Sequence, residues 1–469
     1  MKQKITGKLS INFRDVSFLF DGKDIALVND DEPSVAISFG RGQPEDYDIV
    51  KGITDTNQDI VFFGVRYARG RSISAQGWAV GKGGSMRDGI TAFDAIRFEG
   101  IPVDVFFTPG RAIAYDHKAR TRMQMPSAII FRHPKNFERI INVIVDKEPI
   151  SIKISVGTRY GGAPHGRDIA SVVSYLAFRF QKPVSIANAP KYYLYACDLI
   201  QFISFRQNYN FDNITLYDTF TSGRLTGKQY KFASCHFFKK EYRREYANTI
   251  YNSIIFDEIE TSFKELFEHV VSRRLNGVVT DDLYVPETDA DNNRVNHVDF
   301  LSCALSFEGE YSRRFPGQKS STDELFKDIK VKVLTSINSA YSYYKFPQSN
   351  KMKKRAVGYF SRLIRAVEST DNSLEEKFND IRERYKGIVS SYIDRVIRGE
   401  NNTDVREGKL GSALAEMRNS IAHGAPIPME RLHVAAYKVT RCFIYVLILD
   451  NAGVPHDTIT NIIEKLFRA

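Results

Sequence analysis

The period of the hydrophobic pattern changes once along this chain, and that change limits the folds that the chain can adopt. Up to about residue 160, short segments rich in β-branched and aromatic residues recur between Gly, Asp, Asn and Pro. Segments of this kind, bounded by turn residues, predict antiparallel strands. From residue 239 onward, apolar residues recur mainly at steps of three and four, the period of an amphipathic helix. The pattern predicts an α+β multidomain protein, in which a β-rich N-terminal region, sandwich or barrel-like, precedes an all-helical region.

Individual elements follow from the same pattern. Predicted strands cover residues 9–13, 34–39, 60–65, 101–107 and 140–145. A Gly-rich break at 157–167 is followed by Asp168, which is suited to cap a helix that we expect to reach about residue 180. Predicted helices in the second half cover residues 298–315, 323–344, 355–368, 374–398, 405–423, 430–450 and 455–467.

The length of 469 residues exceeds what one hydrophobic core usually organises, so two or three domains are expected. We place a β-rich N-terminal domain at residues 1–156 and a mixed α/β segment, packed on that domain, at 157–240. A helical domain is predicted to cover residues 241–469.

Charge and cysteine content limit the setting in which the protein works. The formal charge of +10 attracts polyanions and permits nucleic acid as a partner, although a diffuse basic excess is also common in soluble proteins. The four cysteines lie far apart, and no secretory leader precedes them, so we expect buried thiols in a reducing cytoplasm.

No apolar run reaches about 18 residues, and no membrane span is expected. The histidines lack metal-ligand spacing, so neither a metal nor a cofactor is expected.

One predicted helix ends in a group of polar residues whose side chains are suited to catalysis. Leu410, Leu414, Met417 and Ile421 recur at steps of four, three and four, which indicates a buried stripe. Arg418, Asn419 and His423 lie off that stripe. Arg418 and His423 are five residues apart, or about 140° around an ideal helix. Gly424 permits a left-handed turn that swings His423 away from the axis, and a two-fold dimer would let both copies line one cleft.

These residue types suit the cleavage of RNA without a metal. RNA supplies its own nucleophile, the 2′-hydroxyl, so cleavage needs a group that moves protons and a cation that stabilises the transition state. Histidine suits the first task and arginine the second. Asn419 would hold the imidazole or contact the phosphate. The alternative is a helix C-terminus in which Arg418 and His423 satisfy the last carbonyl groups, and spacing alone favours this alternative.

The segment Arg418-Asn-Ser-Ile-Ala-His423-Gly424 resembles the R-x4-6-H signature of the HEPN superfamily. Residues 298–308 resemble a helix of the ApeA-like branch of anti-phage abortive-infection proteins, which also place a β-rich region before the HEPN domain. The resemblance covers about residues 290–450. It implies metal-independent RNA cleavage at composite sites of a dimer, and a role in shutting down an infected cell. The functional residues of the family correspond to Arg418, Asn419 and His423, with Glu308 as a supporting acid.

The densest basic stretch of the chain lies next to aromatic residues 341, 343, 344 and 346. Cations for phosphates beside aromatic rings for base stacking are typical of an RNA-binding surface. The alternative is a solvated helix start beside core aromatics. The basic stretch consists of Lys351, Lys353, Lys354 and Arg355, followed by Arg362 and Arg365, and the first four are the predicted RNA-binding residues.

Three functions follow from these features. The first is an endoribonuclease of an abortive-infection system, whose helical half cuts RNA, with tRNA among the candidates, and whose N-terminal half responds to a phage-derived trigger. This hypothesis expects a homodimer or a higher symmetric oligomer, and no membrane. The second is a HEPN-like domain that binds RNA or nucleotide without cutting. The third is a dimerisation module that serves the β-rich region.

Overall fold

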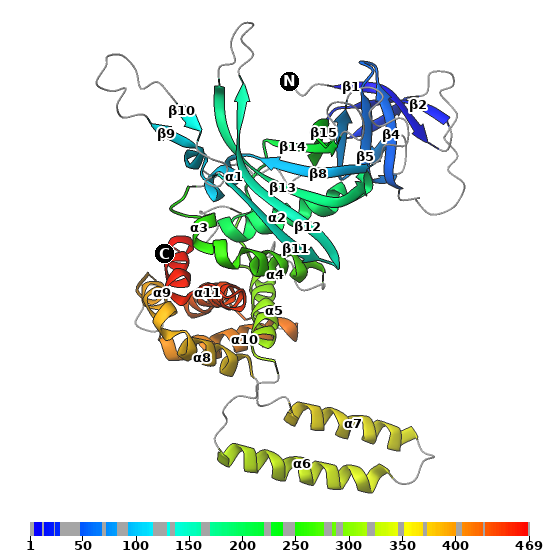
Figure 1. Cartoon of the computed structure of the whole chain (residues 1–469). Coiled ribbons are helices and arrows are strands. Elements are labelled where there is room, and N and C mark those ends of the chain that lie inside the picture. The colour runs from blue at the N-terminus through cyan, green and yellow to red at the C-terminus, as the bar shows by residue number, and fades with distance from the viewer. Residues whose placement is uncertain are drawn as a thin grey trace. The chain divides into compact units, whose positions relative to one another are not determined.

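The computed structural model divides into two compact units, one mostly sheet and one helical (Figure 1). The first unit comprises Met1–Leu275 with Glu287–Asp289, and the second comprises Asn276–Pro286 with Ala290–Ala469. The predicted α+β multidomain fold is therefore confirmed. The structure describes residues 4–11, 14–22, 24–28, 47–67, 72–81, 92–115, 129–131, 137–160, 169–219, 227–237, 249–275, 284–287, 294–316, 324–345, 351–368, 373–399, 406–424 and 427–467.

A thirteen-stranded antiparallel sheet organises the first unit, in the order β11-β12-β13-β8-β14-β15-β7-β5-β4-β1-β2-β3-β6. Strand β6 pairs with both β3 and β5, so β5, β4, β1, β2, β3 and β6 close into a small barrel. The strands are β1 (Ile5–Ile11), β2 (Arg14–Phe20), β3 (Ile25–Val28), β4 (Tyr47–Thr54), β5 (Asp59–Tyr67), β6 (Ser72–Ser74), β7 (Gly77–Gly81), β8 (Ala92–Glu99), β11 (Glu138–Val145), β12 (Glu148–Tyr160), β13 (Ile169–Ser185), β14 (Asn213–Thr219) and β15 (Gln229–Phe237). A separate hairpin joins β9 (Ile113–Tyr115) and β10 (Ile129–Phe131).

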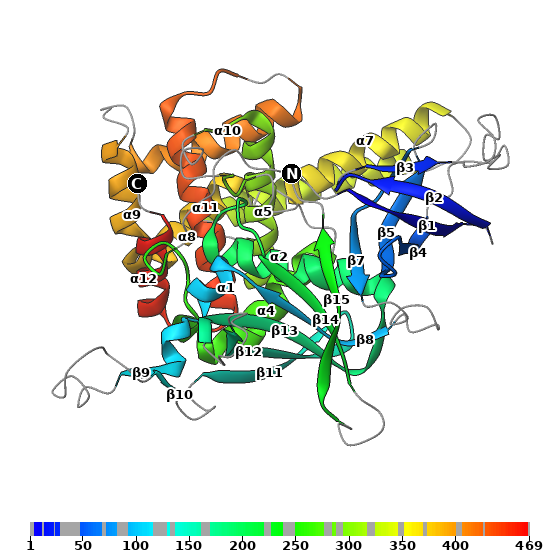
Figure 2. The same cartoon turned by 90° about the horizontal axis from the view of Figure 1, so that it is seen from above.

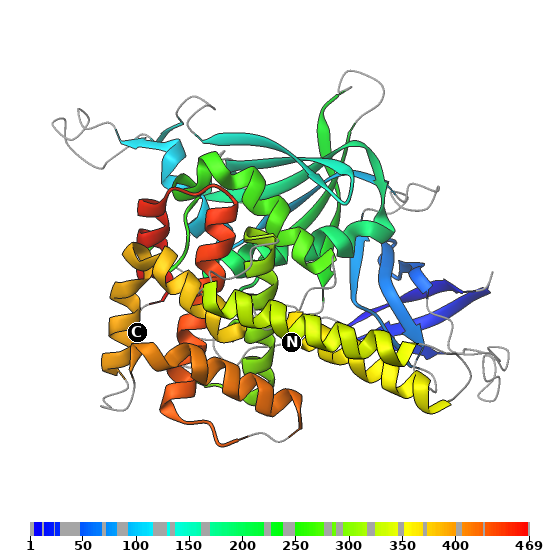
Figure 3. The same ribbon diagram turned by 90° about the horizontal axis from the view of Figure 1, so that it is seen from below.

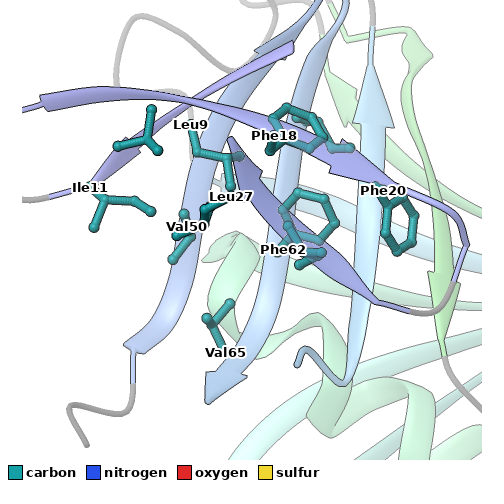
Figure 4. Close-up of a cluster of buried hydrophobic side chains, with 11 residues drawn as sticks. Leu9, Ile11, Phe18, Phe20, Leu27, Val50, Phe62 and Val65 are labelled. Atoms are coloured by element: carbon teal, nitrogen blue, oxygen red, sulfur yellow. The ribbon is translucent and has the colours of Figure 1, made fainter. Parts of the chain in front are cut away.

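Every second side chain along the strands points inward, and these side chains fill the barrel. Leu9 and Ile11 of β1 are buried inside, while the residues between them face outward. Phe18 and Phe20 of β2 both pack edge-on against Phe62 of β5, with ring centroids 5.8 and 5.2 Å apart (Figure 4). Glycine at positions 7 and 52 is required by the close approach of β1 and β4, since a Cβ at Gly52 would lie 2.4 Å from the carbonyl oxygen of Lys8. The predicted barrel-like arrangement is confirmed for this part of the sheet.

Helices in the first unit pack against strands β8, β11 and β13 or against one another. These are α1 (Ile101–Phe106), α2 (Ala189–Ser204), α3 (Phe256–Ile259) and α4 (Phe263–Leu275). The views from above and below show α2 and α4 on one face of the sheet (Figure 2 and Figure 3). Helix α4 packs on β11 and α2, and Phe267 meets Phe178 of β13 with ring centroids 5.7 Å apart.

This packing changes the predicted domain boundaries. Residues 157–240 do not form a separate segment, because β12, β13, β14 and β15 are consecutive or near neighbours in the same sheet as the N-terminal strands. The first unit also extends to Leu275 instead of ending at 240, since Phe263 and Phe267 are buried within it. The helical unit is therefore shorter than the predicted 241–469.

Two predicted elements were wrong, and one lies outside the described residues. The helix after Asp168 is instead strand β13, whose buried residues face both sides of the sheet and so lack the alternation of a half-exposed strand. The strand at 101–107 is instead helix α1, which Pro102 starts and which buries Val103 and Phe106 on one side. The predicted strand at 34–39 lies outside the described residues.

The second unit consists of helices close to those predicted. They are α5 (His297–Arg314), α6 (Glu324–Lys345), α7 (Lys351–Glu368), α8 (Leu374–Arg384), α9 (Lys386–Gly399), α10 (Leu410–Ala422), α11 (Arg431–Asn451) and α12 (His456–Leu466). The helix predicted at 374–398 is divided at Tyr385 into α8 and α9. Helices α6 and α7 pack against each other as a hairpin in which no described side chain is fully buried.

Helix α11 is the core of the second unit. It contacts α5, α9, α10 and α12. It is long and apolar enough to cross a membrane, but 83% of its most apolar window is buried inside the protein, as in the core helix of a soluble protein. The four cysteines, Cys197, Cys235, Cys303 and Cys442, are buried and free of disulfides, as predicted.

A polar network joins four helices at one end of this unit. The carboxylate of Asp450 accepts hydrogen bonds from Tyr385 (2.5 Å), Arg314 (2.6 Å) and His456 (3.1 Å). Burial opposes ionisation of this group, but the hydrogen bonds from these three side chains outweigh it and hold the pKa of Asp450 below its ordinary value. The ionised carboxylate therefore stabilises the folded unit.

We predict that Asp450→Asn lowers the free energy of unfolding by roughly 1.5–3 kcal/mol at neutral pH, because it weakens charge-assisted hydrogen bonds. A lowered folded-state pKa contributes stability that is present above the unfolded-state value of about 4 and is lost as pH falls through the folded-state value. The difference in the free energy of unfolding between the wild type and the variant should therefore become smaller as the pH falls. Denaturant unfolding at several pH values measures this, with Asp394→Asn, at an exposed pair, as the control. Equal losses for the two variants would contradict the prediction.

Candidate functional site

The predicted site lies at the C-terminal end of α10. Leu410, Leu414 and Met417 are buried as expected, whereas Ile421 is only partly buried. This packing turns Arg418 and Asn419 toward the surface. The helix ends at His423, whose backbone N–H donates to the carbonyl oxygen of Asn419 at 3.0 Å. Gly424 follows with φ of +72°, so the predicted left-handed turn is confirmed.

Arg418 is held by two oxygens and remains partly open to solvent. Its Nη2 lies 3.4 Å from Oε2 of Glu308 on α5, and its Nη1 donates to Oδ1 of Asn419 at 3.2 Å. The Arg418 side chain is 32% exposed, whereas its Nε is buried and makes no hydrogen bond within the described part of the chain. The two long contacts leave this guanidinium able to exchange partners.

A second cation shares the same acid. Lys377 on α8 places Nζ 3.3 Å from Oε1 of Glu308, and its side chain is only 13% exposed. Glu308 therefore uses one carboxylate oxygen for each of two cations, Lys377 and Arg418. Sequence reasoning missed Lys377, because this contact joins residues from separate helices and no local motif marks it.

Core packing sets the positions of these groups. Phe443 of α11 contacts Phe307 and Phe378, with ring centroids 6.2 and 4.7 Å apart. Phe307 precedes Glu308 in the chain, and Phe378 follows Lys377. The aromatic cluster thus fixes α5 and α8 next to the acid and the lysine. Sequence-predicted Glu308 and Arg418 are brought together by this packing.

His423 differs from Arg418 in its surroundings. Its side chain is exposed, and the imidazole makes no hydrogen bond to any residue that the structure describes. It is therefore free to meet a ligand or a second protein copy. His433, by contrast, is buried, and its Nδ1 accepts a hydrogen bond from the backbone N–H of Glu430 at the start of α11. His433 is a structural residue of that helix start.

The predicted RNA-binding residues begin α7. Lys351, Lys353, Lys354 and Arg355 occupy its first turns, and their side chains are outside what the structure describes. On the same hairpin, the exposed fraction of Tyr359 is 57%. Tyr341 of α6 lies near Phe360, with ring centroids 6.4 Å apart. Tyr341 and Phe360 are thus only partly buried, and RNA binding stays a prediction.

An exposed apolar strip runs along α5 toward Glu308. Val298 is 60% exposed and Leu305 is 38% exposed, with Leu301 partly buried between them. By helical spacing these residues and Glu308 fall within about 80° of one another. The strip and the acid that binds Arg418 therefore belong to one face of α5.

The first unit has a pocket of about 460 Å³ on the outside of the barrel. Lys8 and Ser10 of β1, Asp15 of β2 and Lys51 of β4 line it. The buried carboxylate of Asp59 on β5 lies at its wall. Charges of both signs therefore line this pocket.

The described residues were also compared with the requirements of a metal site and of a nucleophilic cysteine. No group of three or more His, Cys, Asp or Glu side chains there is arranged to hold a metal ion. Burial raises the pKa of Cys235 and of Cys442, so these thiols stay protonated and are poor nucleophiles. The end of α10, with Arg418 beside Glu308 and His423 exposed to solvent, is the candidate site developed below.

Comparisons of the chain with models of known protein families, with curated proteins and with solved structures found no match. The resemblance to the HEPN superfamily therefore depends on the residues of the motif and on their helical setting.

Proposed function

We propose that this chain is a metal-independent endoribonuclease of the HEPN type that acts in an abortive-infection system against phage. The observation that supports this most is the end of α10, where a partly exposed arginine, an asparagine and an exposed histidine precede a left-handed glycine. The arginine is held by an acid from another helix. These are the groups that a nuclease relying on the RNA 2′-hydroxyl needs.

The reaction uses few protein groups. The 2′-oxygen attacks the adjacent phosphorus, the bond to the 5′-oxygen of the next nucleotide breaks, and a 2′,3′-cyclic phosphate and a 5′-hydroxyl result. One imidazole takes the proton of the 2′-hydroxyl and another protonates the leaving oxygen. Arg418 stabilises the negative charge on the non-bridging oxygens. Asn419 positions the guanidinium, to which it is already hydrogen-bonded.

A second copy of the chain completes this site. Arg418 and His423 are five residues apart, or about 140° around an ideal helix, so one helix end would not bring both side chains to the same phosphate. Packing the exposed strip of Val298, Leu301 and Leu305 against its symmetry mate places two helix ends at one cleft. The proposed assembly is a homodimer or a higher symmetric oligomer in the cytoplasm. The first unit is the regulator that responds to a phage-derived trigger.

A catalytically inactive HEPN-like module that binds RNA or nucleotide, or that only dimerises, is the second candidate. The ion pair between Arg418 and Glu308 favours it, because a structural arginine at a helix end would be engaged in the same way. Protection of RNA without any cleavage product, in the presence of infected-cell extract, would support this function instead.

We predict that Arg418→Ala and His423→Ala each lower the rate of RNA cleavage by about 100-fold or more, since one removes charge stabilisation and the other removes proton transfer. Sequencing of RNA ends from cells that express each protein measures 2′,3′-cyclic phosphate products, and purified protein with and without EDTA tests the independence from metal. Arg398→Ala, at an 82% exposed arginine of the same unit, is the matched control. Unchanged cleavage by the two site variants would rule out the assignment.

The introduction of negative charges on α5 tests the composite site. We predict that Val298→Glu with Leu305→Glu converts the oligomer to a monomer and abolishes cleavage, because like charges would meet across the two-fold axis. Sedimentation measures the mass, and Val331→Glu, at a 61% exposed residue of α6, should leave mass and activity unchanged. Wild-type activity in a monomeric variant would show that one copy suffices.

The basic start of α7 is the proposed RNA-binding surface, with tRNA among the candidate ligands. Changing Lys351, Lys353, Lys354 and Arg355 to Gln should weaken RNA binding and reduce the salt slope of the affinity by up to about 3, at roughly 0.7 for each phosphate that is no longer neutralised. Fluorescence anisotropy over a salt series measures both quantities. The control changes four exposed cations elsewhere in the unit, Lys386, Arg398, Arg406 and Lys409, to Gln. The same slope in both variants would contradict a specific surface.

A further inference from the structure

Glu308, the acid beside Arg418, also pairs with Lys377. This second pair determines how readily Arg418 can bind a phosphate. A guanidinium paired alone with a carboxylate forms a neutral unit, which has little attraction for a phosphate. Here Glu308 meets Lys377 at 3.3 Å through Oε1 and Arg418 at 3.4 Å through Oε2. Two cations and one carboxylate give the cluster a net charge of +1.

Lys377 is the better anchored of the two cations. Its side chain is 13% exposed against 32% for Arg418, and Nζ lies 6.0 Å from the ring centre of Tyr311. Helix α8, which holds Lys377, packs closely on α10 at Gly411, where an added Cβ would lie 3.2 Å from the carbonyl oxygen of Glu375. Lys377 therefore stays in place, while Arg418 is able to leave the acid.

We infer that Lys377 is a positioning residue that neutralises Glu308 and so leaves the Arg418 guanidinium available to an RNA phosphate. When a phosphate approaches, Arg418 exchanges the carboxylate oxygen for a phosphate oxygen, and Glu308 keeps its bond to Lys377. Without Lys377 the same exchange would leave a carboxylate uncompensated beside the incoming phosphate, which costs binding energy. The inference rests on the proposed function, because it assigns Arg418 to an RNA phosphate.

The experiment compares Lys377→Met, Lys377→Arg, Glu308→Gln and the double variant Lys377→Met/Glu308→Gln in the full-length chain. Methionine keeps most of the apolar stem of Lys377 and removes its charge. Affinity is measured with an RNA oligonucleotide that carries 2′-O-methyl groups, which prevent cleavage, so binding is read without any activating trigger. Cleavage of the unmodified oligonucleotide is measured in parallel, and thermal unfolding confirms that each variant folds.

We expect Lys377→Met to weaken binding about tenfold, the size of coupling found between contacting charged residues, while Lys377→Arg binds as the wild type does. In the Glu308→Gln background the same Lys377→Met change should alter affinity less than about twofold, since no carboxylate is left to neutralise. This dependence on Glu308 separates positioning from a direct contact between Lys377 and RNA.

Three results would overturn the inference: an equal effect of Lys377→Met in both backgrounds, no effect in either, or no binding of the oligonucleotide by the wild type. Failure of the proposed nuclease gives a different result, namely binding that follows the expected pattern with no cleavage of the unmodified RNA even in the presence of infected-cell extract. If Lys377→Met does not fold, Lys377→Gln in the two backgrounds replaces it in the comparison.

Discussion

The helical unit depends on the packing of its other helices around α11. This helix is apolar on nearly all sides, so it is stable only when other helices surround it. Phe443 at its middle packs against Phe307 of α5 and Phe378 of α8. The neighbours of these two phenylalanines in the chain are Glu308 and Lys377. One hydrophobic contact in the core therefore determines where an acid and a lysine meet Arg418 at the surface.

The same dependence explains how much of the site could be predicted. The helical period located α10 and its buried stripe, and Gly424 indicated the left-handed end, because these are local properties of the chain. Lys377 has no local signature, since its role comes from a contact between helices that are distant in sequence. Glu308 was found only through a family resemblance, and its distance from Arg418 depends on core packing that no spacing rule describes.

The fold shows a similar division between local and tertiary information. Most helices of the second unit were predicted closely, because apolar residues recur in them at helical spacing, although the helix predicted at 374–398 is divided into α8 and α9. Strand β13 was mistaken for a helix because a central strand buries both faces and loses its alternation. Helix α4 was assigned to the wrong unit because its amphipathic pattern indicates a buried face without indicating which surface covers it. Closure of the barrel depends on β6, a three-residue strand, and on Gly7 and Gly52, none of which a hydrophobic pattern identifies.

A site built from one helix end has a geometric limit that bears on regulation. The chain places Arg418 in contact with an acid and His423 in solvent, and a separation of five residues corresponds to about 140° around an ideal helix. The proposed chemistry needs an arginine that stabilises charge and a histidine that moves protons at the same phosphate. Because one helix end would not bring both groups there, the proposed site uses groups from two copies. Under this proposal, activity would depend on how two helix ends are placed, which is a property of the proposed assembly and not of the single chain. An enzyme whose uncontrolled action would harm its own cell gains a physical restraint from this requirement, because any contact that separates the two ends stops the reaction without altering a single side chain of the site.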